Sequence, residues 1–148
     1  MSRNRFISAM LILFTAPLAQ AVGLRGAILI AADGTFLGTC DGKYSNTSIV
    51  NPYSPYGSPY TQSSIFNQYG PYGSKYTTNS AFNPYTLTAP YLLAADSSLL
   101  RSITSAGYRP TSGFLNALRT SGGSRVSANI SIPNGIDPNV LRSRCESP

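Results

Sequence analysis

The chain has 148 residues, eleven of them basic and five acidic, with two cysteines, no histidine and a formal net charge of +6. The absence of histidine excludes Ser-His and Cys-His nucleophile pairs and imidazole metal sites. The basic residues are scattered rather than clustered, so we expect no nucleic-acid partner, and the length suits a single small domain.

Residues 1–21 have the order of a secretory signal peptide. Arg3 and Arg5 precede an apolar run at 6–14, and residues 19–21 form an A-x-A cleavage site. The run is nine residues long, whereas a membrane-spanning helix needs about 20. We therefore expect cleavage after Ala21, no transmembrane span in the mature chain 22–148, and a secreted or periplasmic location; a retained helix is the alternative. Cleavage leaves nine basic and five acidic residues, a net charge of +4.

The first element expected in the mature chain is a β-hairpin over residues 30–37. Apolar residues flank Asp33 and Gly34, and Asp-Gly is a strong signal for a tight turn. Cys40 follows, and Cys145 lies near the other end of the chain. In an oxidising compartment these two cysteines are candidates for a disulfide that closes a loop of about 105 residues; a pair of free thiols is the alternative.

A 16-residue repeat occupies residues 43–90. The segments 43–58 and 59–74 are identical at nine of sixteen positions, and 75–90 begins in the same way before it diverges. Eight of the ten tyrosines lie in this block, and they are candidates for contact or packing: Tyr44, Tyr53, Tyr56, Tyr60, Tyr69, Tyr72, Tyr76 and Tyr85. Constant phase favours an ordered structure, whereas a disordered linker needs no fixed spacing.

Turn-forming residues recur at fixed positions of the repeat. Asparagine side chains bond nearby backbone, and glycine adopts positive φ without steric cost, so both are predicted to form turns. The turn formers are Asn51, Asn67, Asn83, Gly57 and Gly73. Six prolines in the block exclude long helices and central strands. The tyrosine rings could then stack as a buried aromatic spine or form an exposed contact face, and we expect the buried arrangement.

Four elements are expected after the repeat. Residues 93–100 resemble the first hairpin segment and predict a second hairpin, and 111–120 predict a short helix capped by Ser112. The alternation of apolar residues from Val126 to Ile132 predicts a strand. Asp137 and Pro138 predict the start of a last helical turn that carries Cys145. The fold class is therefore mainly β and irregular, with short hairpins flanking the repeat turns and one or two short C-terminal helices.

The residues that could perform catalysis are few. Asp33 and Asp137 have turn and cap functions, so a pair of catalytic carboxylates would have to use Asp41 and Asp96. No phosphate-binding loop or nucleophile elbow is present, and the repeat contains no acidic residue that would favour calcium. We predict no catalytic residues, no cofactor and no metal, and the sequence favours a protein that is not an enzyme.

The pattern N-x-Y-x-x-Y-G-S-x-Y-x-x-x-S-[IA]-x-N-x-Y, preceded by D-G-T-F-L-G, covers residues 33–95. It resembles a group of short secreted bacterial proteins with the same repeat, for which no activity is known. The resemblance implies export. Members of that group often carry acids before the Ser-Ile step, where this chain has Asn46-Thr47, Gln62-Ser63 and Thr78-Asn79, so an ion-dependent role does not carry over.

The sequence favours an exported protein that acts by binding or as a structural component of the bacterial envelope. The expected partners are an envelope glycan or a protein, because tyrosine, asparagine and serine make good contact surfaces. A secreted hydrolase of unfamiliar type and a secreted inhibitor or effector are the alternatives.

Overall fold

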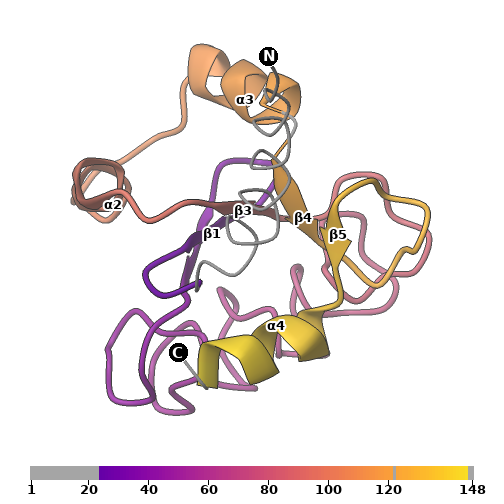
Figure 1. The fold of residues 1–148 in the computed structure, drawn as a ribbon, viewed down its shortest axis with the longest axis horizontal. Coiled ribbons are helices and arrows are strands. Elements are labelled where there is room, and N and C mark those ends of the chain that lie inside the picture. The colour runs from indigo at the N-terminus through magenta and orange to yellow at the C-terminus, as the bar shows by residue number, and fades with distance from the viewer. Residues whose placement is uncertain (1–23, 122, 147–148) are drawn as a thin grey trace, which may run out of the picture.

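The structure, a computed structural model, describes residues 24–121 and 123–146 (Figure 1). The predicted signal peptide at 1–21 lies outside the described residues. The described residues form five short strands, the block of 16-residue repeats between the second and third strands, and three short helices.

A five-stranded mixed sheet forms the centre of the molecule, with strand order β2-β1-β3-β4-β5. The strands are β1 (Ile28–Ile30), β2 (Phe36–Thr39), β3 (Tyr91–Leu93), β4 (Ser124–Val126) and β5 (Gly135–Ile136). All neighbouring strands are antiparallel except β4 and β5, which are parallel. The first predicted hairpin is confirmed: β1 pairs with β2, and Gly34 has a φ of 88° in the connecting turn.

Strand β1 is buried on both faces and separates two hydrophobic clusters. Ile28 and Ile30 belong to the cluster shared with helices α2 (Ser97–Ile103) and α3 (Ser112–Thr120). Leu29 belongs to the other cluster, which contains the repeat block and helix α4 (Pro138–Glu146). The molecule therefore has three layers: α2 and α3 lie on one side of the sheet, and the repeat block and α4 lie on the other (Figure 1).

The second predicted hairpin, over residues 93–100, is wrong. Leu93 ends β3, and Asp96 caps α2 by accepting hydrogen bonds from the backbone N–H groups of Ser98 and Leu99, both at 3.0 Å. The two similar segments diverge because Gly34 allows a tight turn, whereas an aspartate followed by two serines favours a helix start. Helix α2 was not predicted.

The remaining C-terminal predictions are partly confirmed. Helix α3 is present, but its cap is Thr111 rather than Ser112, since the Thr111 hydroxyl accepts from the N–H of Phe114 at 3.1 Å. The strand predicted from Val126 to Ile132 is wrong beyond Val126, where β4 ends. Helix α4 begins as predicted, with the Asp137 carboxylate accepting from the N–H of Asn139 at 2.9 Å.

The repeat block is a chain of tight turns. Backbone N–H groups donate to the carbonyl three residues earlier at Ser48, Asn51, Ser54 and Gly57, and the later units continue this pattern at Ser64, Asn67, Gly70, Ser80 and Thr86. Prolines 52, 55 and 84 occupy the second position of such turns, where their fixed φ fits. The residues whose N–H groups donate these bonds are buried.

The predicted disulfide between Cys40 and Cys145 is confirmed, with a Cα–Cα distance of 5.1 Å. Both residues are buried in the cluster that contains the repeat. The bond joins the chain just after β2 to the end of α4. The fold class is confirmed only in its coarser form, because the helices contain more residues than the strands do.

Candidate binding surface

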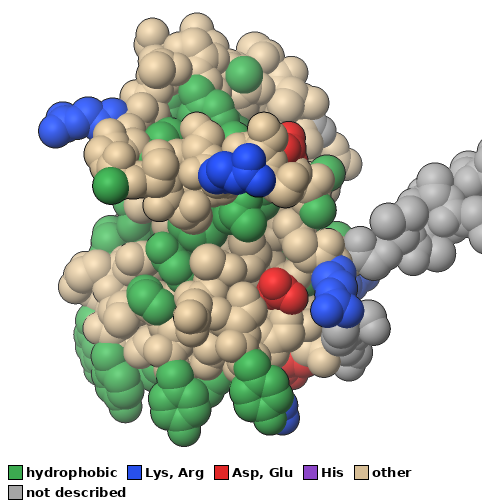
Figure 2. Space-filling model, turned by 90° about the vertical axis from the view of Figure 1, so that its left-hand side faces the viewer, with side chains coloured by type: hydrophobic (Ala, Val, Ile, Leu, Met, Phe, Trp, Pro, Cys, Tyr) green, Lys and Arg blue, Asp and Glu red, His purple; other side chains and the backbone are tan. Residues whose placement is uncertain are grey.

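Six of the eight repeat tyrosines are almost completely exposed, with 86–94% of each residue accessible to solvent. We call these six the tyrosine band: Tyr44, Tyr53, Tyr60, Tyr69, Tyr76 and Tyr85. They follow one another at alternating intervals of nine and seven residues. Figure 2 shows large hydrophobic side chains standing side by side along the lower edge of the molecule, the end at which Figure 1 places the repeat block.

The expectation that the repeat tyrosines form a buried spine is wrong for these six. Of the repeat tyrosines, Tyr56 and Tyr72 are partly buried. The Tyr56 ring meets Phe36 edge-on with centroids 4.8 Å apart, and the Tyr72 hydroxyl donates to Asp33 Oδ2 at 2.8 Å. The buried column is instead aliphatic, formed by Ile49, Ile65 and Ala81.

The buried asparagine of each repeat unit fixes the backbone of the band tyrosine two residues later. The Oδ1 atoms of Asn51, Asn67 and Asn83 each accept from the N–H of the tyrosine two residues later, at 2.9–3.0 Å. Each Nδ2 donates at 2.9 Å to the carbonyl six residues earlier. One buried side chain thus closes two bonds in every unit, so the ring is presented from a fixed backbone.

Serines fix the backbone at two of the other three band tyrosines. The hydroxyls of Ser58 and Ser74 accept from the N–H groups of Tyr60 and Tyr76 at 3.2 and 3.1 Å. The corresponding position before Tyr44 is Gly42, which has no side chain for this bond. The band is therefore fixed at five of its six backbone positions by the same kind of short-range bond.

The predicted reason for the two repeat glycines is wrong. Gly57 and Gly73 do not have positive φ. A Cβ atom at either residue would instead overlap the carbonyl oxygen of the asparagine six positions earlier, Asn51 or Asn67. The glycines are thus required by close approach of the backbone to itself, and not by a left-handed turn.

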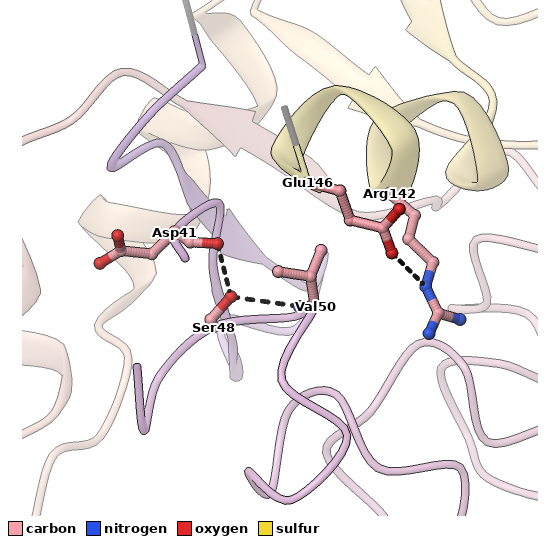
Figure 3. Close-up of polar contacts among 5 residues, drawn as sticks. All are labelled: Asp41, Ser48, Val50, Arg142 and Glu146. Carbon is pink, nitrogen blue, oxygen red and sulfur yellow. Dashed lines mark hydrogen bonds and ion pairs between the residues drawn. The ribbon is translucent and has the colours of Figure 1, made fainter. Parts of the chain in front are cut away.

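A depression of about 930 Å³ lies at the first-unit end of the band. Its lining includes Lys43, Tyr44, Tyr53 and Glu146. Glu146 forms an ion pair with Arg142 of the same helix, with 3.4 Å between Arg142 Nε and Glu146 Oε1 (Figure 3). The Lys43 ammonium lies 5.4 Å from the centroid of the Tyr44 ring. The depression therefore combines exposed aromatic surface with a lysine in its lining.

A buried serine, Ser48, fixes the backbone next to this depression. Ser48 Oγ donates to the Asp41 carbonyl at 2.8 Å and accepts from the N–H of Val50 at 3.1 Å. The Asp41 carboxylate points away from this pair (Figure 3). Ser64 and Ser80 accept in the same way from Phe66 and Phe82, each at 3.0 Å. These hydroxyls are structural, since each completes a backbone turn.

A second, smaller cavity of about 150 Å³ is lined by Tyr91, Arg119 and Arg125 among others. The Arg125 guanidinium lies 4.0 Å from the Tyr91 ring centroid, and its Nε donates to the Ala89 carbonyl at 3.0 Å. This arginine joins β4 to the end of the repeat. Its guanidinium therefore makes contacts within the fold, with the Tyr91 ring and the Ala89 carbonyl.

The structure does not bring the candidate acids together in either cavity. Asp96 caps α2, and Asp41 Oδ1 accepts from the N–H of Gly42 at 2.8 Å. Asp33 accepts from Tyr72, and Asp137 caps α4. Within residues 24–121 and 123–146, no three residues of the His, Cys, Asp and Glu types are grouped to hold a metal.

Sequence reasoning missed Asn129, which makes the same bonds as the repeat asparagines. Its Nδ2 donates to the Thr86 carbonyl at 2.8 Å, and its Oδ1 accepts from the N–H of Ser131 at 3.0 Å. The N–H of Ala128 donates to the Ala81 carbonyl at 2.7 Å. Residues 128–131 thus close one end of the block. The signal available in the sequence was Ser127, two residues before Asn129. Its hydroxyl accepts from the N–H of Asn129 at 2.9 Å.

Comparison with protein-family models, with curated proteins and with solved structures found no match to this chain. The described part of the chain contains no helix of the length and apolar character needed to cross a membrane. The fold and the surface geometry are therefore the basis for a functional proposal.

Proposed function

We propose that this chain is an exported, non-catalytic binding or structural protein of the bacterial envelope, and that the tyrosine band is its contact surface. The observation that carries the proposal is the exposure of six rings on one backbone framework. A folded protein seldom exposes six large aromatic side chains on one framework unless they meet a partner. The Cys40–Cys145 disulfide suits the oxidising compartment that export would provide.

The band has the composition of a recognition surface. Tyrosine supplies rigid contact area at small entropic cost, and the serines, threonines and asparagines between the rings supply hydrogen-bonding groups. Because the turns already fix the backbone beneath the rings, binding loses little further conformational freedom. No comparable display is found among the other exposed large apolar residues described, which are Leu87, Ile130 and Val140.

Retention on purified cell wall tests this proposal. The variant Tyr53→Ser/Tyr69→Ser/Tyr85→Ser removes three rings and keeps the asparagines that form the turns. We expect this variant to be retained at least about tenfold less than wild type, since each ring contributes contact energy. Leu87→Ser, at an exposed apolar side chain outside the band, is the matched control and should bind as wild type does.

Equal retention of wild type and the triple variant would remove the band from the function. Tyr56→Ala/Tyr72→Ala is not a suitable variant for this purpose. Both rings contact the β1–β2 hairpin, through Phe36 and Asp33, so their loss would disturb packing as well as any contact surface.

A further inference from the structure

We propose that the tyrosine band binds a linear glycan that bears carboxylate groups, with the strand lying along the band so that successive sugars meet successive rings. This inference rests on the proposed function and names the partner of the same surface. Three features carry it: the elongated shape of the band, the repetition of one contact, and the charge of the surrounding residues.

The shape of the band favours a strand over a folded protein. Protein interfaces concentrate their binding energy in a few anchors that a ring of neighbours shields from water. Here each ring is exposed individually, and polar turn residues separate one ring from the next. Figure 2 shows large hydrophobic side chains side by side along the lower edge of the molecule, the end at which Figure 1 places the repeat block. A narrow strand can cover such a line, whereas a globular partner would leave its polar gaps unsatisfied.

Repetition of the contact matches a repeating polymer. The three units present their tyrosines with the same asparagine bonds at the same distances. A pyranose ring has an apolar face that can pack on a flat aromatic side chain, and a linear glycan repeats that face at constant spacing. Each ring alone binds weakly, but contacts linked on one strand act together through effective concentration. The band is thus suited to recognise chain length.

The charge near the band favours an acidic strand. Residues 42–95 contain no aspartate or glutamate, and Lys43 and Lys75 directly precede Tyr44 and Tyr76. Lys43 lines the depression at the first-unit end, where Glu146 is already paired with Arg142. A strand bound along the rings would therefore pass two cations that directly adjoin band tyrosines in the chain.

Binding of glycans of defined length tests the inference. The probes are peptidoglycan glycan strands freed of peptides by an amidase, which carry lactyl carboxylates, and chito-oligosaccharides of the same lengths, which lack them. We expect the affinity of wild type for the glycan strands to rise about 100-fold between two and eight sugars. The triple variant Tyr53→Ser/Tyr69→Ser/Tyr85→Ser should lose most of this rise, and Leu87→Ser should retain it.

The lysines supply the test of charge. Lys43→Gln/Lys75→Gln should lower the affinity for eight-sugar glycan strands about tenfold and leave that for chito-oligosaccharides unchanged, because each exposed lysine would lose one modest ion pair with a carboxylate. Unfolding midpoints equal to that of wild type would show that each variant is folded.

Two kinds of failure are distinguishable. If wild type is retained on cell wall through the band but binds glycan strands without dependence on length, or binds only a wall-associated protein, the inference is overturned and the proposed function stands. If wild type is retained on neither cell wall nor glycan, both fail. Equal effects of the lysine variant on both probes would overturn the choice of an acidic strand.

Discussion

Gly57 shows how strongly a single atom is constrained in this fold. An added Cβ would overlap the Asn51 carbonyl, whose asparagine also positions Tyr53. We expect Gly57→Ala to lower the free energy of unfolding by about 1–3 kcal/mol, the usual cost of overpacking. Gly42→Ala is the control, since no atom lies within 4 Å of a Cβ built there. Urea unfolding measures both, and equal midpoints for the two variants would contradict the packing argument.

Tyr72 gives the molecule a pH-dependent contact. Burial raises the pKa of its phenol above the ordinary value, and the Asp33 carboxylate raises this pKa further, although the bond with Thr35 opposes the shift. The folded state therefore favours the protonated phenol. Its stabilisation is complete below the unfolded-state pKa of about 10 and is lost as the pH rises through the folded-state pKa.

Comparison with Tyr72→Phe tests this linkage. At pH 8 we expect the variant to be less stable by about 1 kcal/mol, because it lacks the hydrogen bonds to Asp33 and Thr35. The difference should shrink at about pH 11, as the wild-type phenol ionises beside a carboxylate. Urea midpoints at the two pH values provide the measurement. Tyr69→Phe, at an exposed ring, is the control, and a constant gap for Tyr72→Phe would refute the linkage.

At the scale of elements, α4 depends on the disulfide and on Leu141. The helix has one buried leucine and one buried cysteine as its main apolar anchors, with Pro138 at its first turn. Arg142 adds a contact between α4 and the repeat block, since its guanidinium lies 4.7 Å from the Phe66 ring centroid. Nine residues are too few for a helix to persist alone in water. The covalent link to the end of β2 therefore keeps α4 on the repeat block.

Removal of the disulfide should release α4 before the sheet. By loop entropy, a closed loop of 105 residues is worth about 4–5 kcal/mol, so Cys40→Ala/Cys145→Ala should unfold at a much lower denaturant concentration. Amide exchange by mass spectrometry should accelerate more in 138–146 than in β1. A reducing agent should shift wild type to the midpoint of the variant. Equal acceleration in both segments would show that α4 is not the element held by the bond.

At the scale of the whole molecule, local signals predicted the elements that local bonds determine. The Asp33-Gly34 hairpin and the Asp137 cap each depend on a few neighbouring residues, and both were predicted. Residues 126–132 alternate as a strand should, but Asn129 bonds the end of the repeat block, and this tertiary contact overrides the alternation. The sheet order could not be predicted, because β1 pairs with β3 although the whole repeat block lies between them in the sequence.

The tyrosines of the candidate surface were predicted, but which of them are exposed was not. Composition identifies eight tyrosines, and a 16-residue period alone does not say which side each one faces. A three-residue period within the unit, visible in Asn51, Ser54 and Gly57, marks buried positions of the backbone. This period does not separate Tyr53 from Tyr56, because each tyrosine directly precedes one of these buried residues. The partial burial of Tyr56 comes from a tertiary contact with the Phe36 ring, 4.8 Å between centroids, which the repeat does not encode.

Stability and recognition should therefore separate cleanly in this molecule. The three rings of Tyr53→Ser/Tyr69→Ser/Tyr85→Ser contribute little buried area, so we expect the free energy of unfolding to change by less than about 0.5 kcal/mol for each substitution. Ile65→Ala, which empties a fully buried position in the middle unit, should lose about 2–5 kcal/mol. Urea unfolding of both variants measures this contrast. A triple variant as unstable as Ile65→Ala would mean that the rings support the turns beneath them, and its loss of binding could then not be assigned to the tyrosine band.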